Sequence, residues 1–467
     1  MPIRRISTVA HVGNIAIGGD NPIRIQSMAT TDTNDTEGCV SQAKRIIDAG
    51  GELVRFTTQG TREAENMKNI SARLKADGYR QPLVADVHFN AHVADVAAQY
   101  CEKVRINPGN YVDPARTFKH LEYTDEEYAA ELERIDQRLV PFINICKEHH
   151  TAVRIGVNHG SLSDRIMSRY GDTPEGIVES CMEFLRIFRR EQFNDVVISI
   201  KASNTVVMVQ SVRLLVKAMD AEDMHYPLHL GVTEAGEGED GRIKSAVGIG
   251  ALLTEGIGDT IRVSLSEEPE CEIPVARKLV ELIPECTRLR REAEESIKDD
   301  TITLTLDAPD WETLQLKAAM AVGALLIDRK ATKLEITCGS RFTREQLTSL
   351  SDAILQAARI KFTKTEYISC PGCGRTLYNL QDTIQRIKAA TSHLVGLKIG
   401  IMGCIVNGPG EMADADYGYV GAGRGKISLY RRKECVEKNI PEDEAVERLL
   451  KLIDEDKNKL TSDNETN

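Results

Sequence analysis

Short apolar runs alternate with longer amphipathic stretches from residue 23 to about residue 290. The runs are rich in Val and Ile, which favours buried strands, whereas the stretches between them repeat apolar positions at helical spacing. The eight runs are IRIQSM (23–28), ELVRFT (52–57), PLVADV (82–87), KVRIN (103–107), VRIGV (153–157), DVVISIK (195–201), LHLGV (228–232) and TIRVSL (260–265). Eight such units predict an α/β fold of the (β/α)8 TIM-barrel type, with a doubly wound open sheet as the alternative.

The pattern divides the chain into four parts. We expect the barrel over residues 1–290, with the opening TVAHVGNIAIGG (8–19) as a hairpin that caps its N-terminal face. Residues 291–365 begin in a charged stretch that resembles a linker and continue as a small α/β insert. Residues 366–455 predict a C-terminal α/β domain that ends in an amphipathic helix. The polar tail, 456–467, is expected to be disordered.

The charge balance of the chain is acidic. It contains 59 Lys and Arg residues against 71 Asp and Glu residues, which gives a net charge of −12. A broad basic surface for nucleic acid is therefore not expected. No apolar run is long enough for a membrane span, and the N-terminus lacks the apolar stretch of a signal peptide. We expect a cytoplasmic protein that binds neither nucleic acid nor membrane.

Basic side chains gather at the C-terminal ends of the predicted strands, where barrel enzymes place their catalytic groups. The five are Arg55, Arg105, Arg154, Lys201 and Arg262, and the polar side chains beside them are His88, Asn158 and Ser264. One buried Arg alone is most simply explained by an ion pair with a neighbouring carboxylate. Five cations at one mouth indicate instead a ligand with several negative charges, such as a diphosphate.

A Gly-rich loop, TEAGEGEDGRIKSAVGIG (233–250), precedes a predicted helix, and its backbone N–H groups are suited to an anion. Within it, Glu234 brings a carboxylate to the cationic mouth. That carboxylate is suited either to acid–base catalysis or to a salt bridge, and the sequence pattern does not decide between them.

Three cysteines in Gly-rich turns predict a metal site. They are Cys370 and Cys373, in ISCPGCGRT, and Cys404, in IMGCIVNGPGE. The other eight cysteines stand alone and are expected to be buried thiols. Three thiolates are one short of the usual four for structural zinc or an iron–sulfur cluster. Cys338, Cys435 and Glu411 are candidates for the fourth ligand, and the spacing supports zinc and a cluster equally.

Several longer motifs are spread over nearly the whole chain outside residues 291–365. They include QSM (26–28), VADVHF (84–89), RINPGN (105–110), RIGVNHGSL (154–162), LHLGVTEAG (228–236), CPGCGR and GCIVNGPGE. Together they resemble the 4-hydroxy-3-methylbut-2-enyl diphosphate synthase family of the methylerythritol phosphate route to isoprenoids. The resemblance implies reductive ring opening of 2-C-methyl-D-erythritol 2,4-cyclodiphosphate, with loss of a hydroxyl as water. The residues alone also suit a zinc-stapled barrel lyase or isomerase that acts on a phosphorylated metabolite.

The resemblance also implies roles for individual residues. A [4Fe–4S] cluster would be bound by Cys370, Cys373, Cys404 and Glu411. The diphosphate pocket would be formed by Arg55, Arg105, Arg154, Lys201 and Arg262, with His88, Asn158 and Ser264 beside them. Glu234 would deliver a proton, and Asn407 would lie near cluster and substrate.

The chain departs from the family in its insert. The short form of the family joins barrel and cluster domain almost directly, whereas the long form inserts a large domain, and here only residues 291–365 lie between them. In the short form the cluster domain covers the partner's barrel, which predicts a homodimer, but a spacer would let one chain close on itself. Because no nicotinamide or flavin motif is present, electrons are expected from ferredoxin or flavodoxin.

Overall fold

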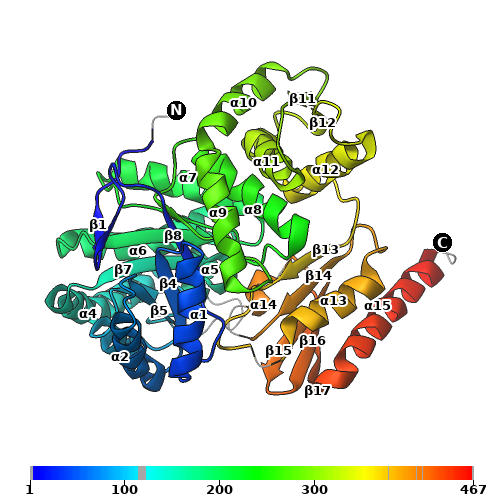
Figure 1. Ribbon diagram of the computed structural model, residues 1–467. Helices are drawn as coiled ribbons and strands as arrows, with labels where there is room; N and C mark the ends of the chain where they lie inside the picture. Colours follow the sequence, from blue (N-terminus) through cyan, green and yellow to red (C-terminus); the bar gives the residue numbers. More distant parts are fainter. Residues whose placement is uncertain (1–3, 114–121, 377, 406–407, 413, 465–467) are drawn as a thin grey trace.

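Eight parallel strands form a nearly closed barrel in the N-terminal part of the chain (Figure 1). This computed structural model describes residues 4–113, 122–376, 378–405, 408–412 and 414–464. The barrel strands are β3 (Arg24–Met28), β4 (Leu53–Thr58), β5 (Leu83–Val87), β6 (Lys103–Ile106), β7 (Ala152–Asn158), β8 (Val196–Lys201), β9 (His229–Leu230) and β10 (Thr260–Ile261).

The strand order β8-β7-β6-β5-β4-β3-β10-β9 follows the order of a TIM barrel. A parallel bridge between Ile198 and Leu228 connects the two ends of the sheet, so the predicted barrel is confirmed and the open sheet is not found. β9 and β10 are shorter than predicted, because the backbone beyond them turns to other acceptors. The Leu265 N–H, for example, donates to the Glu272 carboxylate at 3.2 Å.

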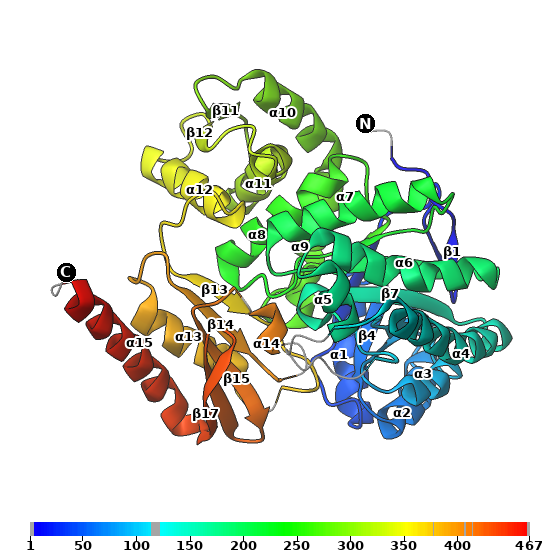
Figure 2. The ribbon, with the colours of Figure 1, turned by 180° about the vertical axis from the view of Figure 1, so that it is seen from behind.

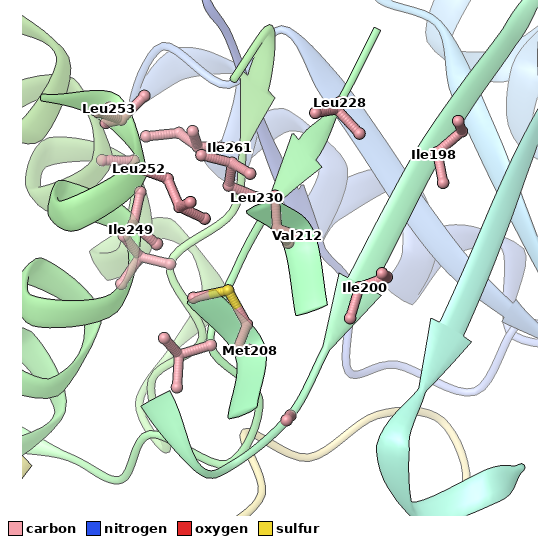
Figure 3. Close-up of a cluster of buried hydrophobic side chains, with 14 of the residues drawn as sticks. Ile198, Ile200, Met208, Val212, Leu228, Leu230, Ile249, Leu252, Leu253 and Ile261 are labelled. Carbon is pink, nitrogen blue, oxygen red and sulfur yellow. The ribbon is translucent and has the colours of Figure 1, made fainter. Parts of the chain in front are cut away.

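Helices cover the outside of the barrel (Figures 1 and 2). They are α1 (Thr36–Asp48), α2 (Thr61–Ala76), α3 (Ala91–Ala98), α4 (Asp125–His149), α5 (Asp164–Tyr170), α6 (Pro174–Arg190), α7 (Thr205–Ala221), α8 (Gly238–Leu253), α9 (Glu272–Glu281) and the short turns η1 (His159–Ser161) and η2 (Pro269–Cys271). Figure 3 shows part of the core, to which Ile200 of β8, Met208 of α7, Leu252 of α8 and Ile261 of β10 all contribute.

The predicted hairpin is present and closes the N-terminal end of the barrel. β1 (Ala10–Val12) pairs antiparallel with β2 (Ile15–Ile17). Its apolar side chains form one fully buried cluster with the first residues of the strands. The members are Ala10, Val12, Ile17, Leu53, Val84, Ala152 and Val197. The hairpin therefore seals the end of the barrel opposite the strand ends that carry the cations.

The insert packs against the outside of the barrel. Its elements are α10 (Ile283–Glu295), β11 (Thr301–Thr305), α11 (Trp311–Ile327), β12 (Lys333–Thr337) and α12 (Arg344–Ala357). Most of the charged stretch predicted as a linker belongs to α10, which is helical because its apolar side, with Cys286 and Leu289, is buried. α11 is buried on all sides from Thr313 onward and lies on α8, where Gly323 allows its backbone to approach Val247.

The C-terminal part forms a five-stranded sheet with helices. Its elements are β13 (Glu366–Ser369), α13 (Leu380–Thr391), β14 (Lys398–Met402), α14 (Gly408–Glu411), β15 (Tyr417–Gly423), β16 (Lys426–Arg431), β17 (Glu434–Pro441) and α15 (Glu442–Asn464). We call this part the cluster domain. The prediction of a disordered tail from residue 456 is wrong as far as Asn464, because α15 continues and Asp456 binds Arg431 at 2.7 Å.

Two smaller findings concern the whole chain. No disulfide joins any two cysteines among the described residues. Of the eight cysteines predicted to be buried, Cys271 is exposed, because it ends η2 at the molecular surface, and Cys435 of β17 is only half-buried. None of the helices in the described segments combines the length and apolar character that a membrane span requires.

Candidate active site

One cavity lies between the barrel mouth and the cluster domain of the same chain. Its volume is about 710 Å³, part of it open to solvent. The barrel residues that line it include Arg55, Asp86, His88, Arg105, Arg154, Asn158, Lys201, Glu234, Arg262 and Ser264. The cluster domain contributes Cys370, Cys373, Arg375, Gly403 and Cys404. The structure thus brings the predicted cations and the three predicted cysteine ligands together, although they are far apart in the sequence.

The two domains meet glycine against glycine. A Cβ added to Gly410 of α14 would lie 1.7 Å from the carbonyl oxygen of Gly160 in η1, so neither position has room for a side chain. Beside this contact, the Ser203 hydroxyl donates to the Glu411 carbonyl oxygen at 2.9 Å. Figures 1 and 2 show α14 between the cluster-domain sheet and the barrel. The motifs RIGVNHGSL and GCIVNGPGE therefore meet at this interface.

Three of the five basic side chains have carboxylate neighbours. Arg105 donates to Asp86 at 3.0 Å, and Arg262 binds both oxygens of Glu272 at 2.9 and 3.0 Å. Arg55 is 3.9 Å from Asp86 and also donates to the Met28 sulfur. Burial acts against the charge on Asp86, but Arg55 and Arg105 hold the pKa of its carboxyl well below its usual range. For these three residues, the ion pair with a neighbouring carboxylate that was expected for a single buried Arg is therefore present.

Arg154 and Lys201 lack such a neighbour. Arg154 is 1% exposed, and its Nε and Nη1 have no hydrogen-bond partner among the described residues. No ion pair joins Arg154 or Lys201 to any carboxylate that the structure describes. Burial lowers the pKa of both groups well below the usual values, and the neighbouring Arg55 lowers it further. Two buried cations without an ion-pair partner among the described residues suit an anion in this part of the mouth.

Glu234 lies in the same mouth in a strained conformation. Its φ of +48° is in the left-handed region, which is unfavourable for a residue with a side chain. The carboxyl is buried, and its Oε2 has no hydrogen-bond partner in the described part of the chain. Burial raises the pKa of Glu234, whereas Thr233 and Lys201 oppose that rise. Glu234 is therefore better suited to hold a proton than an exposed glutamate.

His88 and the two polar neighbours line the same surface. Burial and the charge of Arg105 lower the pKa of His88 to about 3, so its imidazole is neutral and contacts the Arg105 guanidinium. The side-chain amide oxygen of Asn158, Oδ1, accepts from Arg105 at 3.2 Å. Ser264 lies in the segment that follows β10, two residues after Arg262, and lines the cavity. Asn407 lies outside the described residues.

The cysteines surround the opposite side of the cavity. The Gly403 N–H donates to the Cys370 sulfur at 3.1 Å. Of the other proposed ligands, Cys338 is buried at the end of β12, and Cys435 lies in β17 and donates to the Glu437 carbonyl oxygen. Neither residue lines the cavity. Of the cysteines considered as ligands, only Cys370, Cys373 and Cys404 therefore line the cavity.

Glu411, the candidate with a carboxylate, lies next to the barrel but is not among the residues that line the cavity. Its carboxyl is 3% exposed, and its Oε1 has no partner among the described residues. Burial, with the charge of Glu234, raises the pKa of Glu411 well above its usual range. In the described segments, no three His, Cys, Asp or Glu side chains are close enough to hold a single metal ion. Three soft thiols that line one cavity, with the buried Glu411 carboxyl close to it, suit an iron–sulfur cluster, whose ligands are further apart than those of a single metal ion.

Two residues with an evident place in the site were not singled out from the sequence. Arg375 lies two positions after Cys373 and lines the cavity. Glu272 lies in α9, after the last barrel strand, and holds Arg262. Arg375 could have been predicted from the sequence, because the motif CPGCGR places its charge two residues from Cys373. Glu272 offered none, because one Glu among many on an amphipathic helix does not reveal which Arg it will face.

Family models match both halves of this site. Residues 7–277 match the GcpE TIM-barrel domain, and residues 366–455 match the GcpE protein C-terminal domain. The chain belongs to the GcpE family. The residues between the two matches, 278–365, include the whole insert, so neither GcpE family model matches the insert.

Relatives in the GcpE family are similar over almost their full length. A 4-hydroxy-3-methylbut-2-en-1-yl diphosphate synthase (flavodoxin) of Bacteroides fragilis is 52% identical over 597 aligned positions, which cover 96% of this chain and 95% of that protein. Proteins of the same name from Akkermansia muciniphila and Protochlamydia amoebophila are 42% and 38% identical, with coverage of 96–97%. Since the alignments are longer than the 467 residues of this chain, these relatives contain residues that it lacks.

Proposed function

We propose that the chain catalyses the reductive conversion of 2-C-methyl-D-erythritol 2,4-cyclodiphosphate to 4-hydroxy-3-methylbut-2-enyl diphosphate. The observation that carries the proposal is the single cavity in which unpaired cations of the barrel face three cysteines of the cluster domain. The names of relatives that are 38–52% identical support the same reaction. They give no support to the alternative, a zinc-stapled lyase or isomerase.

The barrel side of the cavity would bind the diphosphate. Arg154 and Lys201 supply charge that no described carboxylate neutralises, and the Arg154 guanidinium is suited to bidentate contact with phosphate oxygens. Arg55, Arg105 and Arg262 are already oriented by Asp86 and Glu272, so they would meet the substrate with little loss of side-chain freedom. Ser264, Asn158 and neutral His88 would contribute hydrogen bonds without further charge.

The other side of the cavity would hold the cofactor. Cys370, Cys373, Cys404 and Glu411 are the residues that would bind a [4Fe–4S] cluster, which supplies electrons and Lewis acidity when bound. The Gly403 N–H stays available to one ligand sulfur. Glu411 is the harder and more easily displaced ligand, and it lies against the barrel, on the side from which the substrate would approach.

Glu234 would manage a proton in this reaction. Loss of one hydroxyl as water consumes two electrons and two protons overall. Burial favours the protonated form of the Glu234 carboxyl, and its Oε2 is free to donate into the cavity. Glu234 is 7% exposed, and this burial would limit the access of water to reactive species beside it.

The electron donor we propose is flavodoxin, because the relatives carry that word in their names. Ferredoxin remains the other donor to test. In this structure the barrel and the cluster domain of one chain together line the cavity. The dimer and the cytoplasmic location stay predictions.

The decisive experiment is anaerobic reconstitution with iron and sulfide, followed by metal analysis and turnover of the cyclic diphosphate with reduced flavodoxin. We expect about four irons per chain and activity in the wild type, and neither in a Cys404→Ser variant. The matched control is Cys435→Ser, which changes a thiol outside the cavity and should leave both intact. A wild type that holds one zinc and no sulfide would refute the proposal.

A further inference from the structure

A basic side chain of the cluster domain enters the cavity beside the cysteines. Arg375 belongs to the loop that carries Cys370 and Cys373, and it lines the cavity together with them. Its Nε and Nη1 atoms are buried and have no hydrogen-bond partner in the described part of the chain. Buried guanidinium N–H groups without partners are costly, so their orientation toward the cavity indicates a bound group that accepts from them.

The charges around Arg375 come from both domains. Three groups that can carry negative charge act on its guanidinium: the sulfurs of Cys373 and Cys404 and the carboxylate of Asp86. The guanidinium also donates a hydrogen bond to the Cys404 sulfur. In the barrel, its charge acts on Arg105. Arg375 therefore lies between the sulfur ligands and the ends of β5 and β6.

The backbone of the cysteine loop holds Arg375 in this place. A Cβ at Gly374 would lie 2.7 Å from the carbonyl oxygen of Thr31, so the loop lies directly on the β3–α1 connection of the barrel. On the other side of Arg375, the Thr376 hydroxyl accepts from the Cys373 N–H at 3.2 Å. Both contacts fix the residues that flank Arg375, so its direction is set by the closed arrangement of the two domains.

We propose that Arg375 is a positioning residue that raises the reduction potential of the cluster by holding a positive charge and N–H donors beside the sulfur ligands. The inference rests on the proposed function. One-electron reduction makes a cluster more negative, so a fixed cation and N–H···S hydrogen bonds stabilise the reduced form more than the oxidised form. The barrel cations differ in role, since they surround the proposed diphosphate position.

The test is a redox titration of the substrate-free, reconstituted holoprotein, followed by EPR. In Arg375→Gln we expect the equilibrium for reduction to fall at least tenfold, which is 59 mV for one electron. Arg375→Lys keeps the charge and should shift the equilibrium by less than Arg375→Gln. The matched control is Arg386→Gln, an exposed cation on α13 of the same domain, which should leave the potential unchanged.

Each other outcome has a defined meaning. An unchanged potential with a raised KM would overturn the proposal and make Arg375 a substrate ligand. An equal shift in Arg375→Lys and Arg375→Gln would overturn it because charge would not be the cause. If Arg375→Gln and a second neutral variant, Arg375→Met, both lose the cluster, Arg375 serves assembly and the tuning role is refuted. A wild type without iron and sulfide would refute the proposed function itself, which metal analysis detects separately.

Discussion

Replacement of Arg154 by Met should make the substrate-free protein more stable and the diphosphate site weaker. Arg154 is 1% exposed and two of its nitrogens lack partners. Folding lowers its pKa, so it binds its proton less tightly in the folded state, and at neutral pH its charge opposes folding. Since the penalty for an uncompensated buried ion is several kcal/mol, we expect Arg154→Met to gain about 1–3 kcal/mol of unfolding free energy.

The same replacement should weaken substrate binding. Bidentate contact with a phosphate supplies two charge-assisted hydrogen bonds, each of about 1.5–3 kcal/mol. Their loss corresponds to an affinity lower by roughly 10²- to 10⁴-fold. Urea unfolding followed by circular dichroism measures the first effect, and calorimetric titration with the cyclic diphosphate measures the second.

Arg165→Met is the matched control for this prediction. Arg165 is equally buried in the barrel, at 2% exposure, but it binds Glu183 at 2.7 and 2.8 Å and Asp113 at 3.3 Å. Its removal leaves carboxylates without a counter-ion and should cost about 3–5 kcal/mol. The two variants should therefore change stability in opposite directions. Equal destabilisation by both would show that Arg154 is ordinary scaffold and would refute the anion-site argument.

Three further predictions test proton donation by Glu234, closure of the cluster domain on the barrel, and the packing of the insert. Glu234→Gln should lower kcat by about 10²- to 10⁴-fold. Because burial raises the pKa of Glu234, wild-type activity should fall as pH rises through that pKa. A wild-type pH profile without this fall would contradict the role of Glu234 as a proton donor. Gly410→Ala brings a Cβ to 1.7 Å from the Gly160 carbonyl oxygen. The clash should displace the cluster domain from the barrel by about 1 Å or more and lower kcat by about 10²-fold. Gly423→Ala, whose Cβ meets nothing closer than 4.0 Å, is the control, and equal kcat values in the two variants would show that domain closure is not required. Met320→Ala in fully buried α11 should cost about 2–5 kcal/mol in urea unfolding, and a smaller loss than 1 kcal/mol would mean that the insert is not part of the core.

Much of the fold could be predicted from the sequence, because each part of the barrel is specified by neighbouring residues. The spacing of apolar residues within each strand–helix unit predicts that unit. Because parallel strands need a crossover helix between them, eight repeated units predict the barrel. The helix α10 and the end of α15 were missed for the opposite reason. Their charged residues suggest exposed chain, and only contacts such as Arg431 with Asp456 keep the segment helical.

The sequence by itself determined which chemical groups this protein has: five basic side chains at strand ends, three cysteines in tight turns, and the motifs that identify the family. Residue types and short spacings are properties of the chain alone. Only the tertiary structure decided which cations are neutralised, because Arg262 meets Glu272 while Arg154 meets no described carboxylate. It also decided that the cluster domain closes on its own barrel and that Arg375 joins the site, because the direct approach of Gly410 to Gly160 depends on backbone packing between distant segments.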